Sequence, residues 1–186
     1  MISIGALWLP ILLSAVFVFA VSSIIHMFLG YHWNDNRAPA QQDAILEAMR
    51  SLNVQAGDYM LPKPDSMKQF HSPDFKAKFE RGPVVLMTVI ARGTTNMGKN
   101  LLQWFVYLLV VGLFCAYIAG RELPVGAPYL SVFRLVGFAA FMAYAMALPQ
   151  ASIWYHRNWR MTLVTMFDGL VFALLTGGTF GWLWPH

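Results

Sequence analysis

Charge and cysteine are both scarce in this sequence. Only 12% of its 186 residues are charged, whereas 58% are hydrophobic. Because soluble domains carry about 25% charged residues, this composition is typical of a membrane protein. The one cysteine, Cys115, lies inside an apolar run, which excludes a disulfide framework and a Cys-x-x-Cys metal or redox pair.

Common catalytic and cofactor motifs are also missing. The sequence contains no Gly-x-Ser-x-Gly, no His-x-x-x-His and no haem-attachment motif. Its net charge of +4 is modest, so nucleic acid is not an expected partner. We therefore expect no cofactor, and the motifs do not favour an enzyme.

Apolar runs long enough to cross a bilayer occur four times, at roughly 4–29, 101–119, 130–148 and 161–184. About 20 apolar residues span the hydrocarbon core as a helix, so each run predicts a transmembrane helix. The third should end at Pro149, because proline interrupts a helix, with the turn in the loop QASIWYHRNW.

Basic residues lie almost entirely on one side of these predicted spans. Eleven of the 13 fall in the first and third connections, which face the same side of a four-span chain. The positive-inside rule places that side in the cytoplasm and both termini outside. These residues are Arg37, Arg50, Lys63, Lys68, Lys76, Lys78, Arg81, Arg92, Lys99, Arg157 and Arg160.

The first connection is too long and too patterned to be a simple linker. PAQQDAILEAMRSL has an apolar stripe at helical spacing, and SPDFKAKFERG reads as a helix with Ser72 as N-cap and Gly82 beyond its end. PVVLMTVIA and GDYMLP are candidate strands, and we expect the resulting unit to pack on the helix ends.

The predicted organisation is a transmembrane helix in 1–30, a cytoplasmic α+β insert in 31–100, and three transmembrane helices in 101–186. The fold class is an all-α membrane protein, a four-transmembrane-helix bundle with that insert.

Small residues recur at every fourth position of three predicted spans. In lipid, such ladders let helix backbones approach closely. They favour a compact bundle, with one face available for another subunit or a second copy of the chain. The residues are Gly169, Ala173, Gly177 and Gly181 in the fourth span, Gly112, Ala116 and Gly120 in the second, and Ala139, Ala143 and Ala147 in the third.

Two ionisable residues stand out within the predicted spans. Asp168 lies about two turns into the fourth span and His26 about one turn from the end of the first, so the topology places them at similar depth. A carboxylate in hydrocarbon costs on the order of 3 kcal/mol unless it finds a partner. We therefore predict that His26 partners Asp168 or shares a wet pocket with it. In one interpretation the pair relays a proton or helps to bind a cation. In the other, which we favour, Asp168 accepts hydrogen bonds from loop groups and fixes the register of the bundle, while His26 caps the interface.

A metal site is a further hypothesis. The candidate ligands near the predicted inner face are His26, His32, Asp35 and His156. Their spacing fits no metal motif, and a zinc site needs three or four convergent ligands, which spacing alone does not establish.

The strings DGLVFALLTGGTFGWLWP, from Asp168 to Pro185, SSIIHM, YH and ERGP resemble an uncharacterised family of small four-span proteins of the bacterial inner membrane. The resemblance covers most of the chain and implies a bacterial inner membrane. It implies no activity.

The function expected from these observations is that of an accessory, assembly or scaffold protein of a membrane complex. The expected partners are the lipid bilayer and other membrane subunits or further copies of the chain. A homo-oligomeric channel or small-ion or proton transporter using Asp168 and His26 is the first alternative. A metal-dependent membrane enzyme is the second.

Overall fold

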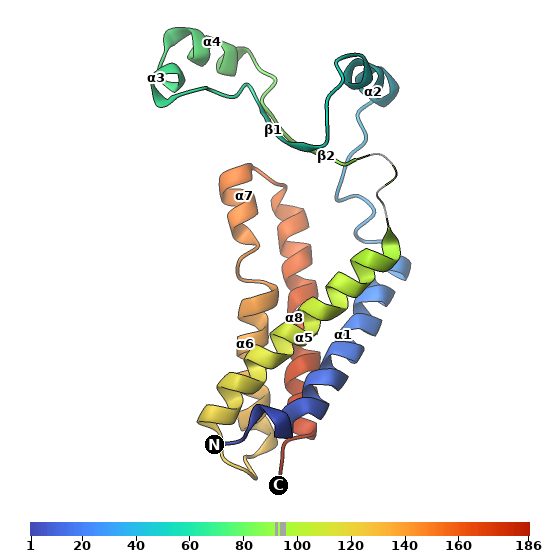
Figure 1. Ribbon diagram of the computed structural model, residues 1–186, viewed down its shortest axis with the longest axis vertical. Helices are drawn as coiled ribbons and strands as arrows, with labels where there is room; N and C mark the ends of the chain where they lie inside the picture. Colours follow the sequence, from blue (N-terminus) through green and yellow to red (C-terminus); the bar gives the residue numbers. More distant parts are fainter. Residues whose placement is uncertain (92, 94–95) are drawn as a thin grey trace. The chain divides into compact units, whose positions relative to one another are not determined.

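The chain folds into two compact units. The computed structural model describes residues 1–91, 93 and 96–186, so Arg92, counted above among the basic residues, lies outside the described residues. Residues 1–37 and 97–186 form a helical unit, and residues 38–96 form a second unit, the insert (Figure 1). The loop 31–37, predicted as part of the insert, therefore folds with the helices.

The helical unit contains four helical segments long and apolar enough to cross a membrane, as predicted. They are 4–28, 97–122, 129–155 and 159–182. The first consists of the 3₁₀ turn η1 (Ile4–Leu7) followed by α1 (Trp8–Phe28), and the second is α5 (Met97–Glu122). The third combines α6 (Tyr129–Tyr144) and α7 (Pro149–Tyr155), and the fourth is α8 (Trp159–Trp182).

The third segment differs from its prediction at Pro149. We expected the helix to end there, but Pro149 is the first residue of α7. Proline is tolerated at the first helical position, where its missing N–H needs no partner, so a short break at 145–148 is followed by a new helix. This helix ends where His156 takes a left-handed conformation, with φ of 52°.

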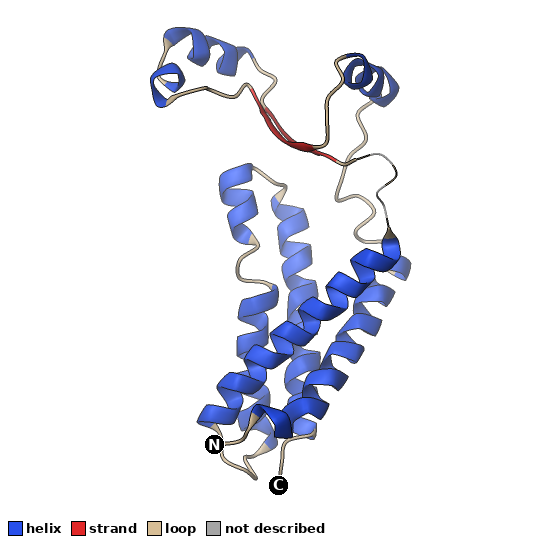
Figure 2. Ribbon diagram, viewed as in Figure 1, coloured by secondary structure: helices blue, strands red, loops and turns tan. Residues whose placement is uncertain are grey.

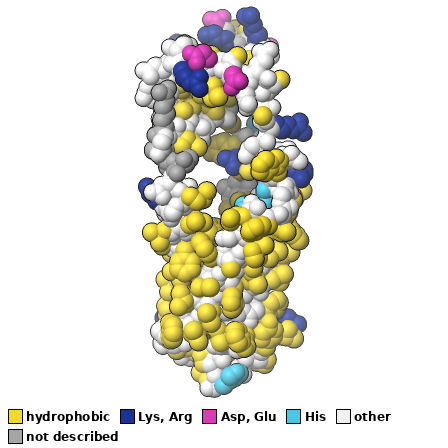
Figure 3. Space-filling view, turned by 90° about the vertical axis from the view of Figure 1, so that its right-hand side faces the viewer, with side chains coloured by type: hydrophobic (Ala, Val, Ile, Leu, Met, Phe, Trp, Pro, Cys, Tyr) yellow, Lys and Arg dark blue, Asp and Glu magenta, His cyan; other side chains and the backbone are white. Residues whose placement is uncertain are grey.

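The core of the helical unit lies between helices that are distant in sequence. Helix α6 packs along α8, while α1 contacts both α5 and α8. Apolar residues also cover much of the outside, and on the face shown in Figure 3 hydrophobic side chains dominate this unit. An apolar exterior of this kind is what lipid requires of a spanning helix.

The small-residue ladders of α5 and α8 lie at close contacts inside this unit. A Cβ added at Gly177 would lie 2.8 Å from the carbonyl oxygen of Phe133, and one at Gly169 would lie 3.0 Å from Ala145 Cβ. In α5, a Cβ at Gly112 would meet Ile11 at 3.3 Å, and all three ladder positions of that helix are buried. These two ladders are therefore occupied by contacts within one chain.

The insert has the two helices and two strands that its sequence predicts, and one short helix, α3 (Met67–Phe70), that was not predicted. Helix α2 (Gln42–Ser51) precedes the strand β1 (Gly57–Leu61), and two short helices, α3 and α4 (Pro73–Arg81), precede the strand β2 (Val85–Val89). The strands pair antiparallel, with Tyr59 opposite Met87 (Figure 2). Ser72 caps α4 as predicted, because its hydroxyl accepts from the Phe75 amide at 3.2 Å.

Burial in the insert is very limited. Among the described residues 38–96, the only buried side chain is Phe75. It contacts the rings of Phe70 and Phe79, at centroid distances of 5.7 and 6.1 Å. Within the insert itself, α2 contributes no buried residue.

Both chain ends are bonded to the α5–α6 region. The Ile2 amide donates to the Gly120 carbonyl at 2.8 Å, and the Gly126 amide donates to the Pro185 carbonyl at 2.8 Å. The indole of Trp184 donates to the Pro124 carbonyl at 2.9 Å. One end of the helical unit is thus closed by hydrogen bonds between segments far apart in sequence.

Candidate functional site

The candidate site is centred on Asp168, a carboxylate buried in α8. Only 1% of its side chain is exposed. Both of its oxygens are hydrogen-bonded: the Tyr31 hydroxyl donates to Oδ1, and His32 Nε2 lies 2.7 Å from Oδ2. Both partners come from the loop that follows α1, so the carboxylate joins the first span to the fourth.

His32 lies between two carboxylates. Its Nδ1 is 2.6 Å from Asp35 Oδ2, and its Nε2 faces Asp168. An ionised carboxylate only accepts, so a ring that bonds one through each nitrogen donates twice and carries a positive charge. Burial lowers the pKa of His32, but the hydrogen bonds to Asp35 and Asp168 outweigh it, and the net effect raises the pKa above its usual value.

Tyr31 is the second loop residue bonded to Asp168. Burial of its hydroxyl and the hydrogen bond to the Asp168 carboxylate raise the pKa of Tyr31 above its usual value. The phenol therefore stays protonated and remains a donor. Asp168 thus faces one neutral donor and one charged donor.

The loop carrying these residues is also attached to the first turn of α8. Arg160 places one guanidinium nitrogen 3.5 Å from Asp35 Oδ1 and the other 3.4 Å from the Tyr31 carbonyl oxygen. Arg160 and Asp168 are eight residues apart, which is about 12 Å along a helix. The loop 31–35 therefore contacts α8 at two levels, which fixes the position of His32.

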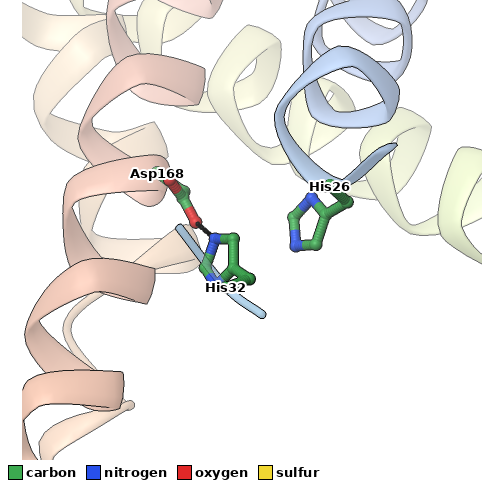
Figure 4. Close-up of side chains that lie close together, drawn as sticks. All are labelled: His26, His32 and Asp168. Atoms are coloured by element: carbon green, nitrogen blue, oxygen red, sulfur yellow. Dashed lines mark hydrogen bonds and ion pairs between the residues drawn. The ribbon is translucent and has the colours of Figure 1, made fainter. Parts of the chain in front are cut away.

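His26 lies beside this network but does not bond to Asp168. Its Nδ1 is 2.9 Å from the Ser22 carbonyl oxygen in the preceding turn of α1. Its ring stacks on that of His32, with centroids 4.7 Å apart and planes 4° from parallel. In Figure 4, His26 extends from the end of α1, His32 from the loop that follows it, and Asp168 from α8. His26 is thus not the partner that we predicted for Asp168. The bonds from Tyr31 and His32 instead agree with the interpretation that loop groups donate to Asp168, because the chain turns back toward α8 after α1.

Three potential ligands converge here. His26, His32 and Asp168 each offer an atom that lies within 4.8 Å of the others, and they are the one such group of histidine, cysteine and acidic side chains among the described residues. Asp35 adjoins the group through His32. His156, the other candidate ligand, is an exposed residue at the end of α7 and does not belong to the group.

Sequence reasoning missed two members of the site, Tyr31 and Arg160. A signal was present in the string YHWND at 31–35, which directly follows a predicted span and in which every side chain can form a hydrogen bond. The string shows that the loop is polar. It does not show that the loop folds back onto a residue 136 positions later.

Comparisons of this chain with protein-family models, with curated proteins and with solved structures find no match. The functional argument therefore depends on the residues described above.

Proposed function

We propose that this chain is an accessory, assembly or scaffold subunit of a membrane complex in the bacterial inner membrane. The observation that supports the proposal is the insert, which buries one side chain among its described residues. A folded unit of this size needs a larger apolar core than that, or else a surface that covers it. A partner subunit supplies such a surface.

The apolar side chains of α2 are the part of the insert best suited to a partner. Ile45 is 46% exposed and Leu46 is 47% exposed. The polar residues of this helix include Glu47 and Arg50, which pair at 2.8 Å. An amphipathic helix presenting its apolar side in this way is a recurrent means of binding another protein.

The proposed orientation places the insert in the cytoplasm and both termini outside. It is supported by four candidate spans and by the predominance of basic residues in the two connections assigned to the inner side. The resemblance described above supports the bacterial inner membrane as the location. A cytoplasmic insert would meet soluble partners as well as membrane-bound ones.

Site-specific photo-crosslinking in native membranes tests this function. A photo-reactive residue at position 45 should form an adduct with one other protein, whereas the same residue at position 47, on the polar side of α2, should not. The variant Ile45→Ser should abolish the complex, while the control Glu47→Gln should leave it intact. Adducts with lipid alone, or equal adducts from both positions, would contradict the proposal.

Two alternatives differ in their support. A homo-oligomeric channel or small-ion or proton transporter would use Asp168 and His26, and both carboxylate oxygens of Asp168 are already bonded to Tyr31 and His32. A metal-dependent enzyme is the second candidate function, because His26, His32 and Asp168 converge at one place. It requires a bound ion before any chemistry can be assigned.

A further inference from the structure

We propose that His26, His32 and Asp168 bind one divalent first-row transition-metal ion, of which Zn²⁺ is the representative. This inference is independent of the proposed scaffold function. It rests on the convergence of the three side chains within 4.8 Å and on which atoms their other hydrogen bonds leave available. The ion would join the end of the first span, the loop after it and the fourth span.

Each histidine has one nitrogen committed to an acceptor. The Ser22 carbonyl can only accept, so His26 Nδ1 carries the proton and the lone pair of a neutral ring lies on Nε2. Likewise, Asp35 accepts from His32 Nδ1, so the nitrogen left to bind an ion is the Nε2 that faces Asp168. Both rings therefore donate through Nδ1 and can bind an ion only through Nε2, which on His32 must first lose its own proton. Because the two ring planes are 4° from parallel in the stack, one ring must rotate before both Nε2 lone pairs point at the same ion.

The groups around the three ligands are those found around metal sites. A ligating histidine usually donates its other N–H to a carboxylate or a backbone carbonyl, which orients the ring and raises its basicity. Here Asp35 accepts the N–H of His32 Nδ1, and the Ser22 carbonyl accepts the N–H of His26 Nδ1. Tyr31 donates to Oδ1 of Asp168, which leaves Oδ2 as the ligand atom.

Without metal, a proton lies where the ion would bind. His32 Nε2 and Asp168 Oδ2 are 2.7 Å apart, a hydrogen-bond distance. Ligand bonds to Zn²⁺ of about 2.0–2.2 Å require the two atoms to separate only slightly. A divalent ion would displace the His32 Nε2 proton to solvent, so the charge at the site would rise by one. The His32 imidazolium with the carboxylates of Asp35 and Asp168 sums to −1, whereas the ion with neutral His32 and the same carboxylates sums to zero.

The donor set selects the class of ion. Two imidazole nitrogens with one carboxylate oxygen suit Zn²⁺ and Fe²⁺, whereas Mg²⁺ and Ca²⁺ prefer oxygen ligands throughout. The cluster offers no thiolate, so it does not favour Cu⁺. Three protein ligands leave a coordination position for water, which is the arrangement of catalytic rather than structural zinc sites.

Metal titration of the full chain in mild detergent tests the site. The purified protein is stripped with a chelator, then titrated with Zn²⁺ by calorimetry and with Co²⁺ by visible absorption. We expect one equivalent to bind. The variants His26→Ala and His32→Ala should each weaken binding by at least 100-fold, and Asp35→Asn should weaken it by roughly 10- to 100-fold.

A matched control separates this site from adventitious binding. His156→Ala removes an exposed histidine outside the cluster and should leave affinity and stoichiometry unchanged. His26 is also exposed, so its alanine variant should remain folded, which thermal unfolding without metal will verify. The proposal is overturned if the unmutated protein binds no equivalent of either ion, or if His26→Ala and His156→Ala bind them equally.

Discussion

Exposed apolar side chains occur in both units of this protein, but the two units differ in the buried core that lies beneath them. In the helical unit they surround a core of buried residues contributed by α1, α5, α6 and α8, as expected for helices in lipid. In the insert they surround almost nothing, because Phe75 is its one buried side chain among the described residues. The helical unit thus has an apolar core of its own, whereas the insert has almost none among its described residues.

Protease accessibility should separate the two units most sharply. Trypsin added to inverted membrane vesicles should cut within 38–96 and leave the spans intact, because the insert carries exposed basic residues and little buried structure. In intact spheroplasts the same sites should be protected. Electrophoresis with mass spectrometry of the fragments provides the measurement, and cleavage within 38–96 in intact spheroplasts would show that the proposed orientation is wrong. The susceptible residues are Arg50, Lys68, Lys76, Lys78 and Arg81.

A single methyl group should destabilise the helical unit. In Gly177→Ala the new carbon would lie 2.8 Å from the Phe133 carbonyl oxygen and 3.1 Å from Gly137, so α6 and α8 must separate. Overpacking of this kind costs about 1–3 kcal/mol. Thermal unfolding in detergent should therefore begin at a lower temperature than in the unmutated protein.

The neighbouring glycine provides the control for that variant. An added Cβ at Gly178 would lie 3.6 Å from the Tyr129 hydroxyl, an ordinary contact, so Gly178→Ala should not lower the unfolding temperature. If both alanine variants unfold at the same temperature, the close contact between α6 and α8 does not determine the stability of this unit.

In the insert, a single substitution should lower the stability of one helix by a small amount and leave the rest of the insert unchanged. Ser72→Ala removes the N-cap of α4 and should cost about 1 kcal/mol, which speeds amide exchange in that helix roughly fivefold. Ser51→Ala in α2 is the control, because the Ser51 hydroxyl bonds only within its own helix. Hydrogen exchange read by mass spectrometry should resolve the two helices, and faster exchange throughout the insert would show that the effect is not local.

Features that depend on local sequence could be predicted. The four long helices follow from the length of the apolar runs, and the start of α4 follows from Ser72 and Pro73, both of which act within one turn. Pro149 was interpreted wrongly because proline both ends and begins helices, and only the residues after it decide between the two.

The site could be predicted only in part, because its contacts are long-range. A depth argument identified Asp168 as a residue in need of a partner and His26 as a neighbour, and both lie in the cluster. That argument estimates the depth of a residue from its distance to the end of its span. It therefore does not predict where the residues of a loop lie. Tyr31 and His32 lie in such a loop, and their bonds to Asp168 depend on a turn that the sequence does not specify.

The hydrogen bonds that hold Ile2 to Gly120 and Pro185 to Gly126 have a practical consequence for experiments. A tag or reporter domain joined directly to either terminus would pull on the backbone that these bonds position. Fusions should therefore carry a flexible glycine- and serine-rich spacer before the added domain. Without one, a loss of signal could reflect a distorted turn between α5 and α6 rather than the side of the membrane on which the reporter resides.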